Sequence, residues 1–122
     1  MRIGFLGIQC DTANLGLAAL AYAGVKLAAD AGPRDVELVL FSINSDRELQ
    51  RMRESLCLAD TPIRAVPFYH KRPMAMGNSI REIAACDVVI DFTGGDSFSD
   101  IYGVKRLMRK LFHKQLVLAT RT

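Results

Sequence analysis

The chain has 122 residues, of which 50% are hydrophobic and 24% charged, and a formal net charge of +3. This length suits one domain, and the composition is that of a globular protein, which excludes intrinsic disorder. The apolar segment 15–29 contains Lys26 and is shorter than the roughly 20 residues of a membrane span, so neither a span nor a targeting segment is predicted. No C-x-x-C pair occurs among Cys10, Cys57 and Cys86, and two of the three lie in or beside apolar runs. Reduced, buried thiols and a cytoplasmic location are therefore expected.

The first half of the chain alternates short apolar runs with helical patterns. It predicts a strand over residues 2–8, a helix over 15–30, a strand over 36–43 and a helix over 46–56. Gly32-Pro33 ends the first helix, because glycine suits a helix end and proline cannot continue it. Ser45 and Glu48 form a capping box that opens the second helix.

The second half continues the alternation. It predicts a strand over 62–68, a loop over 69–77, a helix from the capping box Ser79/Glu82 to residue 85, a strand over 88–92, an amphipathic helix over 100–113 and a strand over 116–119. Repeated β-α units with short loops favour a parallel, doubly wound sheet with right-handed crossovers. We therefore expect a single Rossmann-like domain over 1–122, with three layers in the order α/β/α.

Positive charge gathers at the end of the chain. Residues 101–122 contain six Lys and Arg and no acid, so the first 100 residues carry a net negative charge. A basic helix of this kind can bind phosphates or a membrane surface. The simpler interpretation is the solvated face of an amphipathic helix, and this is our expectation.

Two polar loops follow predicted parallel strands, over residues 9–16 and 93–100. If those strands are neighbours, the two loops line one crevice at the carboxyl edge of the sheet, where open α/β folds bind ligands. The helix N-termini at this edge favour an anion such as phosphate. The lining residues would be Asp11, Asn14, Gly16, Gly94, Gly95, Asp96, Ser97 and Asp100. Neither loop carries a dinucleotide-binding fingerprint or a P-loop.

The same residues also have purely structural explanations. Asn14 suits a helix N-cap, and Gly94-Gly95 suits a tight turn. Three aspartates lie close together in the sequence: Asp91, Asp96 and Asp100. Together they could hold Mg²⁺, or one of them could act as a base on a sugar hydroxyl. We predict no metal site from this pattern.

Two segments resemble the polysaccharide pyruvyl transferase family. One is Asn14-Leu15-Gly16, which matches the family's Asn-Leu-Gly at the start of its first helix. The other is 87–103, in which a strand ends in Gly-Gly followed by Ser and Asp. The family usually has an acid after the first motif, where this chain has Leu17. The resemblance covers essentially the whole chain, but only the amino-terminal half of a typical family member.

The resemblance implies the amino-terminal domain of a two-domain transferase of the GT-B type. Such enzymes move a pyruvyl group from phosphoenolpyruvate to a sugar hydroxyl during synthesis of cell-surface polysaccharide (exopolysaccharide), with no further cofactor. Asp96 and Asp100 would be catalytic. The substrate-binding residues would be Asn14, Gly16, Gly94, Gly95 and Ser97.

Other functions remain open. The chain could be a non-catalytic nucleotide- or phosphate-binding Rossmann module, or a fragment of a GT-B glycosyltransferase. Because the resemblance ends before the second half of the cleft, we expect no turnover from this chain alone. An exposed apolar face on the cleft side would favour a homo-oligomer. The expected partners are phosphoenolpyruvate and a saccharide acceptor, and no nucleic acid.

Overall fold

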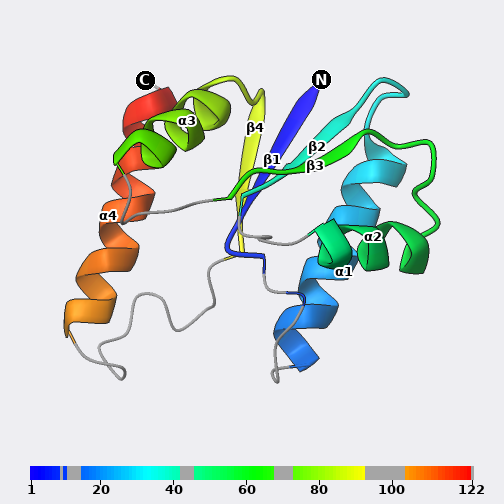
Figure 1. The fold of residues 1–122 in the computed structure, drawn as a ribbon, viewed down its shortest axis with the longest axis horizontal. Coiled ribbons are helices and arrows are strands. Elements are labelled where there is room, and N and C mark those ends of the chain that lie inside the picture. Colours follow the sequence, from blue (N-terminus) through cyan, green and yellow to red (C-terminus); the bar gives the residue numbers. More distant parts are fainter. Residues whose placement is uncertain (9, 11–14, 42–45, 68–72, 93–103, 122) are drawn as a thin grey trace.

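The structure is a computed structural model that describes residues 1–8, 10, 15–41, 46–67, 73–92 and 104–121. Strands and helices alternate along the chain (Figure 1). Their bounds are β1 (Arg2–Leu6), α1 (Leu15–Ala31), β2 (Glu37–Leu40), α2 (Asp46–Ser55), β3 (Ile63–Ala65), α3 (Pro73–Ala84), β4 (Val88–Asp91) and α4 (Val104–Arg121).

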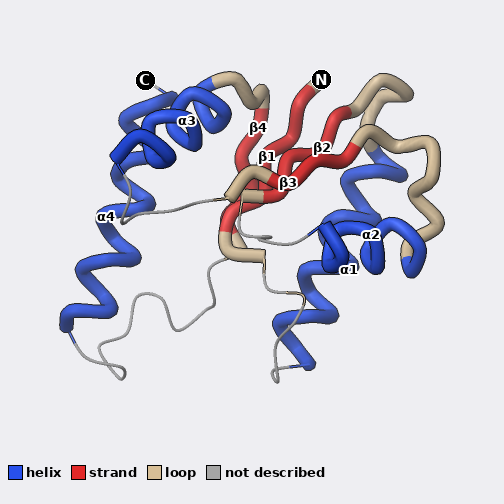
Figure 2. Tube along the Cα trace, viewed as in Figure 1, coloured by secondary structure: helices blue, strands red, loops and turns tan. Residues whose placement is uncertain are grey.

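The four strands form one all-parallel sheet in the order β3-β2-β1-β4. In the register, Gly4 of β1 lies between Val39 of β2 and Val89 of β4. Helices cover both faces of this sheet, with α1 and α2 on one side and α3 and α4 on the other (Figure 2). The predicted α/β class with a parallel sheet is confirmed.

Alternating side chains of the strands build a separate core on each face. Phe5 and Leu38 point toward Val25 of α1, within a cluster that also includes Met52 of α2. On the other face, Val39 packs with Ile83 of α3. Strands that are buried on both faces need apolar residues in nearly continuous runs, which is the pattern seen in β1 and β2.

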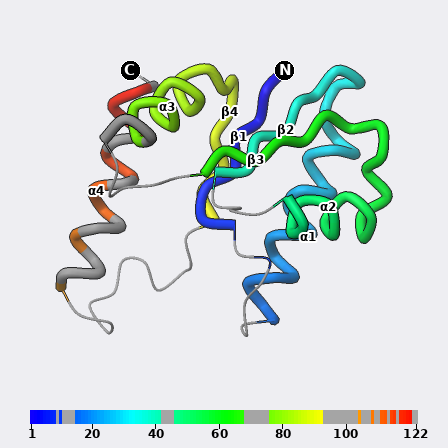
Figure 3. The backbone as a smooth tube through the Cα atoms, in the orientation of Figure 1, coloured from blue at the N-terminus to red at the C-terminus, as the bar shows by residue number. Residues whose placement is uncertain are grey.

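The helices are longer than the strands they cover. At about 1.5 Å per residue in a helix and 3.3 Å in a strand, α1 is roughly 25 Å long and β1 roughly 16 Å. The first turns of α1 and α4 therefore extend past the carboxyl ends of the strands, on opposite sides of the sheet (Figure 3). The start of β1 and the last turn of α4 both lie toward the amino edge. No helix in the described part of the chain is long and apolar enough to cross a membrane.

The helix α3 begins earlier than the sequence predicts. We expected a loop over 69–77 and a helix opened by Ser79, but residues 73–77 are already helical. Proline favours the first position of a helix, and Pro73 was the signal that we overlooked. Ser79 lies inside α3, fully buried, and its hydroxyl donates to the carbonyl of Pro67 at 3.1 Å. This hydrogen bond links α3 to the residues that follow β3, and Ser79 does not cap the helix.

The predicted last strand is wrong. Residues 116–119 continue the helix α4, which runs to Arg121. No glycine or proline occurs between Gly103 and the end of the chain, so nothing in the sequence stops the helix at His113. Helical geometry also allows Val117 to pack against the core beneath α3 and α4.

Strand lengths also differ from the predictions. β1 stops at Leu6, because Gly7 has φ 70°, a left-handed conformation that breaks an extended strand. β2 ends at Leu40 and β3 spans only three residues, so both are shorter than expected. In the first helix, α1, Ala21 and Val25 are fully buried.

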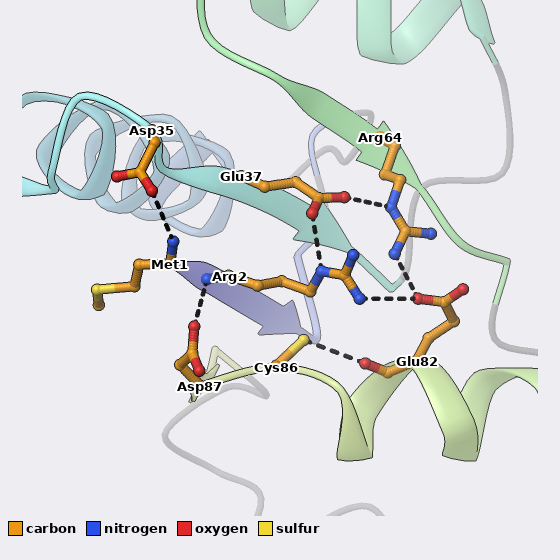
Figure 4. Close-up of polar contacts among 8 residues, drawn as sticks. All are labelled: Met1, Arg2, Asp35, Glu37, Arg64, Glu82, Cys86 and Asp87. Atoms are coloured by element: carbon orange, nitrogen blue, oxygen red, sulfur yellow. Dashed lines mark hydrogen bonds and ion pairs between the residues drawn. The ribbon is translucent and has the colours of Figure 1, made fainter.

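Four charged side chains close the amino edge of the sheet in a ring (Figure 4). Glu37 of β2 accepts from Arg2 of β1 at 2.8 Å and from Arg64 of β3 at 2.7 Å. Glu82 of α3 accepts from Arg64 and lies 3.8 Å from a second nitrogen of Arg2. The ring carries two charges of each sign, so it joins three strands and a helix without excess charge.

Candidate site at the carboxyl edge of the sheet

The strand order reverses between β1 and β4. The chain passes from β1 to β2 and then β3 in one direction, and β4 then pairs on the opposite side of β1. The connections that leave β1 and β4 consequently diverge to opposite faces. In open α/β sheets, this divergence at the carboxyl ends of two neighbouring strands is where ligands bind. The expectation that the two polar loops follow adjacent strands is confirmed by the pairing of Leu6 with Asp91.

Most of the predicted site residues lie outside the described part of the chain. These are Asp11, Asn14, Gly94, Gly95, Asp96, Ser97 and Asp100. Gly16 is described: it is the second residue of α1 and is exposed at the projecting end of that helix. Each of the two polar segments is flanked by described residues: Cys10 and Leu15 for the first, and Phe92 and Val104 for the second.

A pair of aromatic rings supports the end of β4. The ring of Phe92 stacks on Phe5, with 5.9 Å between centroids and an interplanar angle of 7°. The backbone N–H of Phe92 donates to the carbonyl of Leu6 at 2.8 Å, which extends the β1–β4 pairing by one residue. Because Phe92 immediately precedes residues 93–103, this stack fixes the point from which that segment departs.

Gly24 makes room for the ring of Phe92. A Cβ atom at Gly24 would lie 2.3 Å from Cζ of Phe92, far inside van der Waals contact. The glycine thus allows α1 to approach the β4 end closely, at the cost of lower helix propensity. Neither Gly24 nor Phe92 is identified as a site residue by the sequence patterns described above. The only signal was a glycine in the middle of an otherwise strong helical pattern, which often has a packing reason.

An ion pair joins β4 to α4 at the same edge. Nζ of Lys114 lies 2.8 Å from Oδ2 of Asp91, and about a quarter of each side chain is exposed. Asp91 is one of the three aspartates that could hold Mg²⁺ according to the sequence, and its carboxylate forms this ion pair with Lys114. Among the described residues, no group of three His, Cys, Asp or Glu side chains could hold a metal ion.

The described thiol at this edge is not a nucleophile. Burial, together with the negative charge of Glu48 on α2, raises the pKa of Cys10 to about 12. Burial is also the main reason why the pKa of Tyr22 on α1 is raised. Cys10 therefore stays protonated at neutral pH, where only a thiolate would attack a substrate. All three cysteines are free: Cys86 is buried, Cys10 is half-buried and Cys57 is exposed.

The described residues thus define the two sides of this edge. The ends of β1 and β4 are held together by the Phe5–Phe92 stack, and the starts of α1 and α4 lie on opposite sides of the sheet (Figure 1). The first turn of α1 contains no acidic residue, so no carboxylate of that turn offsets the positive end of the helix dipole at this edge. A positive helix end of this kind suits a polar or anionic ligand. In comparisons with protein-family models, curated proteins and solved structures, nothing matches this chain.

Proposed function

We propose that this chain is the amino-terminal, Rossmann-like domain of a polysaccharide pyruvyl transferase of the GT-B type. The observation that carries the proposal is the pairing of β1 with β4. It brings the ends of the strands that precede Asn14-Leu15-Gly16 and the Gly94-Gly95 segment to one edge. These are the two segments that resemble the family.

In this proposal the edge binds the saccharide acceptor. Carboxylates and amides each take several hydrogen bonds, which suits a ligand rich in hydroxyl groups. Asp100 would act as the base that removes a proton from the attacking hydroxyl, and Asp96 and Ser97 would orient the sugar. Asn14 and Gly16 would shape the floor of the cleft beside α1, and phosphoenolpyruvate would be held largely by a second domain.

The test is a transfer assay on the complete protein that contains this chain, with phosphoenolpyruvate and a saccharide acceptor. Loss of a positioned base costs 10²-fold or more, so Asp100→Asn should lower kcat by roughly 100-fold. Asp60→Asn, which changes an exposed aspartate before β3, is the matched control and should leave kcat unchanged. Unchanged turnover in Asp100→Asn would remove that residue from the mechanism, and absence of pyruvyl transfer by the unmodified protein would remove the proposal.

One observation favours a second candidate, a non-catalytic module that binds nucleotides or phosphates. The start of α1 at the point of strand reversal has no acid in its first turn, which suits an anion. A thermal-shift screen separates the candidates. Stabilisation by nucleotides, with sugars and phosphoenolpyruvate inert, would favour the binding module over the transferase.

A further inference from the structure

The helix α4 turns large apolar side chains toward solvent. Val104, Met108, Phe112 and Leu118 are 64%, 59%, 53% and 65% exposed. Val104, Met108 and Phe112 recur every four residues, so they form one stripe along the first half of the helix. The described contacts of α4 with the sheet come from other positions, Lys114 and Val117. An amphipathic helix is expected to bury its apolar side, and these positions are exposed instead.

The same helix carries the positive charge of the chain. Six of the 16 Lys and Arg residues lie within 104–121, which contains no Asp or Glu. The remaining residues hold ten Lys and Arg against 13 Asp and Glu, a net charge of −3. Exposed apolar side chains and excess positive charge thus coincide on one element of the fold.

An anionic lipid surface satisfies both features. A helix that lies in the bilayer interface buries an apolar stripe between the headgroups, and its Lys and Arg side chains attract anionic lipids. A helix with side chains is about 10–12 Å wide and the Debye length at physiological salt is about 8 Å. Positive charges on the near side and on the flanks of the helix are therefore within electrostatic reach of a surface on which it rests. An apolar patch on another protein would cover the stripe but would leave the charge unexplained.

We propose that α4 docks this protein on an anionic membrane surface, with Val104, Met108 and Phe112 inserted among the headgroups. α4 runs along an outer side of the molecule, and its first turns extend beyond the sheet, so this stripe is not covered by the described core (Figure 1). The helix would lie on the surface, since none of the described helices can span a bilayer. The proposal is independent of the transferase assignment.

The experiment measures binding of the purified protein to vesicles by co-sedimentation. Vesicles of phosphatidylcholine are compared with vesicles in which phosphatidylglycerol replaces about a third of the lipid. We expect at least tenfold tighter binding to the anionic vesicles, weakened by added salt. The double variant Met108→Ser/Phe112→Ser should reduce that binding by roughly tenfold or more, because two apolar side chains no longer insert.

The matched control is Leu27→Ser, which removes an apolar side chain that is 69% exposed on α1, across the sheet. It should bind anionic vesicles like the unmodified protein, and circular dichroism should show that both variants keep their helical content. Equal binding to both vesicle types, no binding to either, or an equal loss in Leu27→Ser would overturn the proposal. A dimer in light scattering that Met108→Ser/Phe112→Ser converts to a monomer would assign the stripe to a protein interface and would also overturn it.

Discussion

The two edges of the sheet are built from different chemistry. At the amino edge, Arg2, Glu37, Arg64 and Glu82 satisfy one another in a closed ring of balanced charge. Among the described residues of the carboxyl edge, the corresponding supports are an aromatic stack, the close approach at Gly24 and one ion pair. Within the described part of the chain, the amino edge is therefore held by charged groups that pair with one another, whereas the carboxyl edge is held mainly by packing.

This difference separates stability from function. Substitutions in the ring should change the free energy of unfolding without changing ligand binding, because the ring lies at the opposite end of the strands from the candidate site. Substitutions beneath Phe92 should change both, because they move the start of residues 93–103. Two experiments test this separation, and a third tests the end of α2, away from both edges.

The largest effect is expected from Gly24→Ala. The added Cβ must displace the ring of Phe92, and overpacking of this kind costs about 1–3 kcal/mol. Replacing glycine in a helix also gains up to about 1 kcal/mol of helix propensity. We therefore expect a net loss of about 1–2 kcal/mol in the free energy of unfolding, measured by urea denaturation. Binding of the proposed saccharide acceptor should weaken together with this loss of stability.

Two further variants isolate the steric part of this effect. Ala23→Gly changes the exposed neighbouring residue of α1 and reports helix propensity alone. Gly24→Ala/Phe92→Leu should be about as stable as Phe92→Leu alone, because the ring that the added Cβ would meet is absent from both. A Gly24→Ala protein that is more stable than the original would show that Phe92 does not require the glycine.

A smaller, pH-dependent effect is expected from Glu82→Gln. Hydrogen bonds from Arg64 are the main reason why the pKa values of Glu37 and Glu82 are lowered. A carboxyl group whose pKa is lower in the folded protein stabilises the fold above its ordinary pKa of 4.5, and that stability disappears as pH falls through the folded value. Since these side chains are partly exposed and screened by water, we expect Glu82→Gln to cost about 1 kcal/mol at pH 7.

The difference between Glu82→Gln and the original protein should shrink as the pH falls below 4.5. Urea unfolding at pH 7, 4 and 3 measures it. Glu54→Gln, on the exposed side of α2, is the control and should differ little from the original protein at each pH. A difference for Glu82→Gln that stays constant over this range would mean that packing, and not charge, explains it. Binding of the proposed saccharide acceptor to Glu82→Gln at pH 7 should be unchanged.

The smallest effect is expected from Cys57→Gly, which should stabilise the protein. Cys57 has φ 53° after the end of α2, where the N–H of Leu58 donates to the carbonyl of Arg53 at 3.0 Å. This left-handed helix end favours glycine, so the substitution should add about 0.5–1 kcal/mol to the free energy of unfolding. Cys57→Ala, which removes the thiol but keeps a Cβ, is the control. Equal stability of the glycine and alanine variants would contradict the conformational explanation.

The sequence predicted the elements best where local signals agree. The strands β1, β2 and β4 and the helices α1 and α2 lie where apolar runs and caps place them, within a few residues. The choice of a parallel α/β fold follows from their alternation. Prediction failed at α3, where a proline start was overlooked, and at residues 116–119, where a short apolar run suits a strand or a buried helix equally well.

The sequence by itself determined the class of the fold, the crowding of polar residues after β1 and β4, and the basic character of α4. Only the tertiary structure decided that β1 and β4 are neighbours, because parallel strands pair across long stretches of chain and no local pattern encodes their order. It alone placed Phe92 against Gly24, and Arg2 and Arg64 beside Glu37 and Glu82. Periodicity shows that a helix has an apolar stripe, but what the stripe contacts depends on packing. For this reason the exposure of Met108 and Phe112 could be found only in the folded chain.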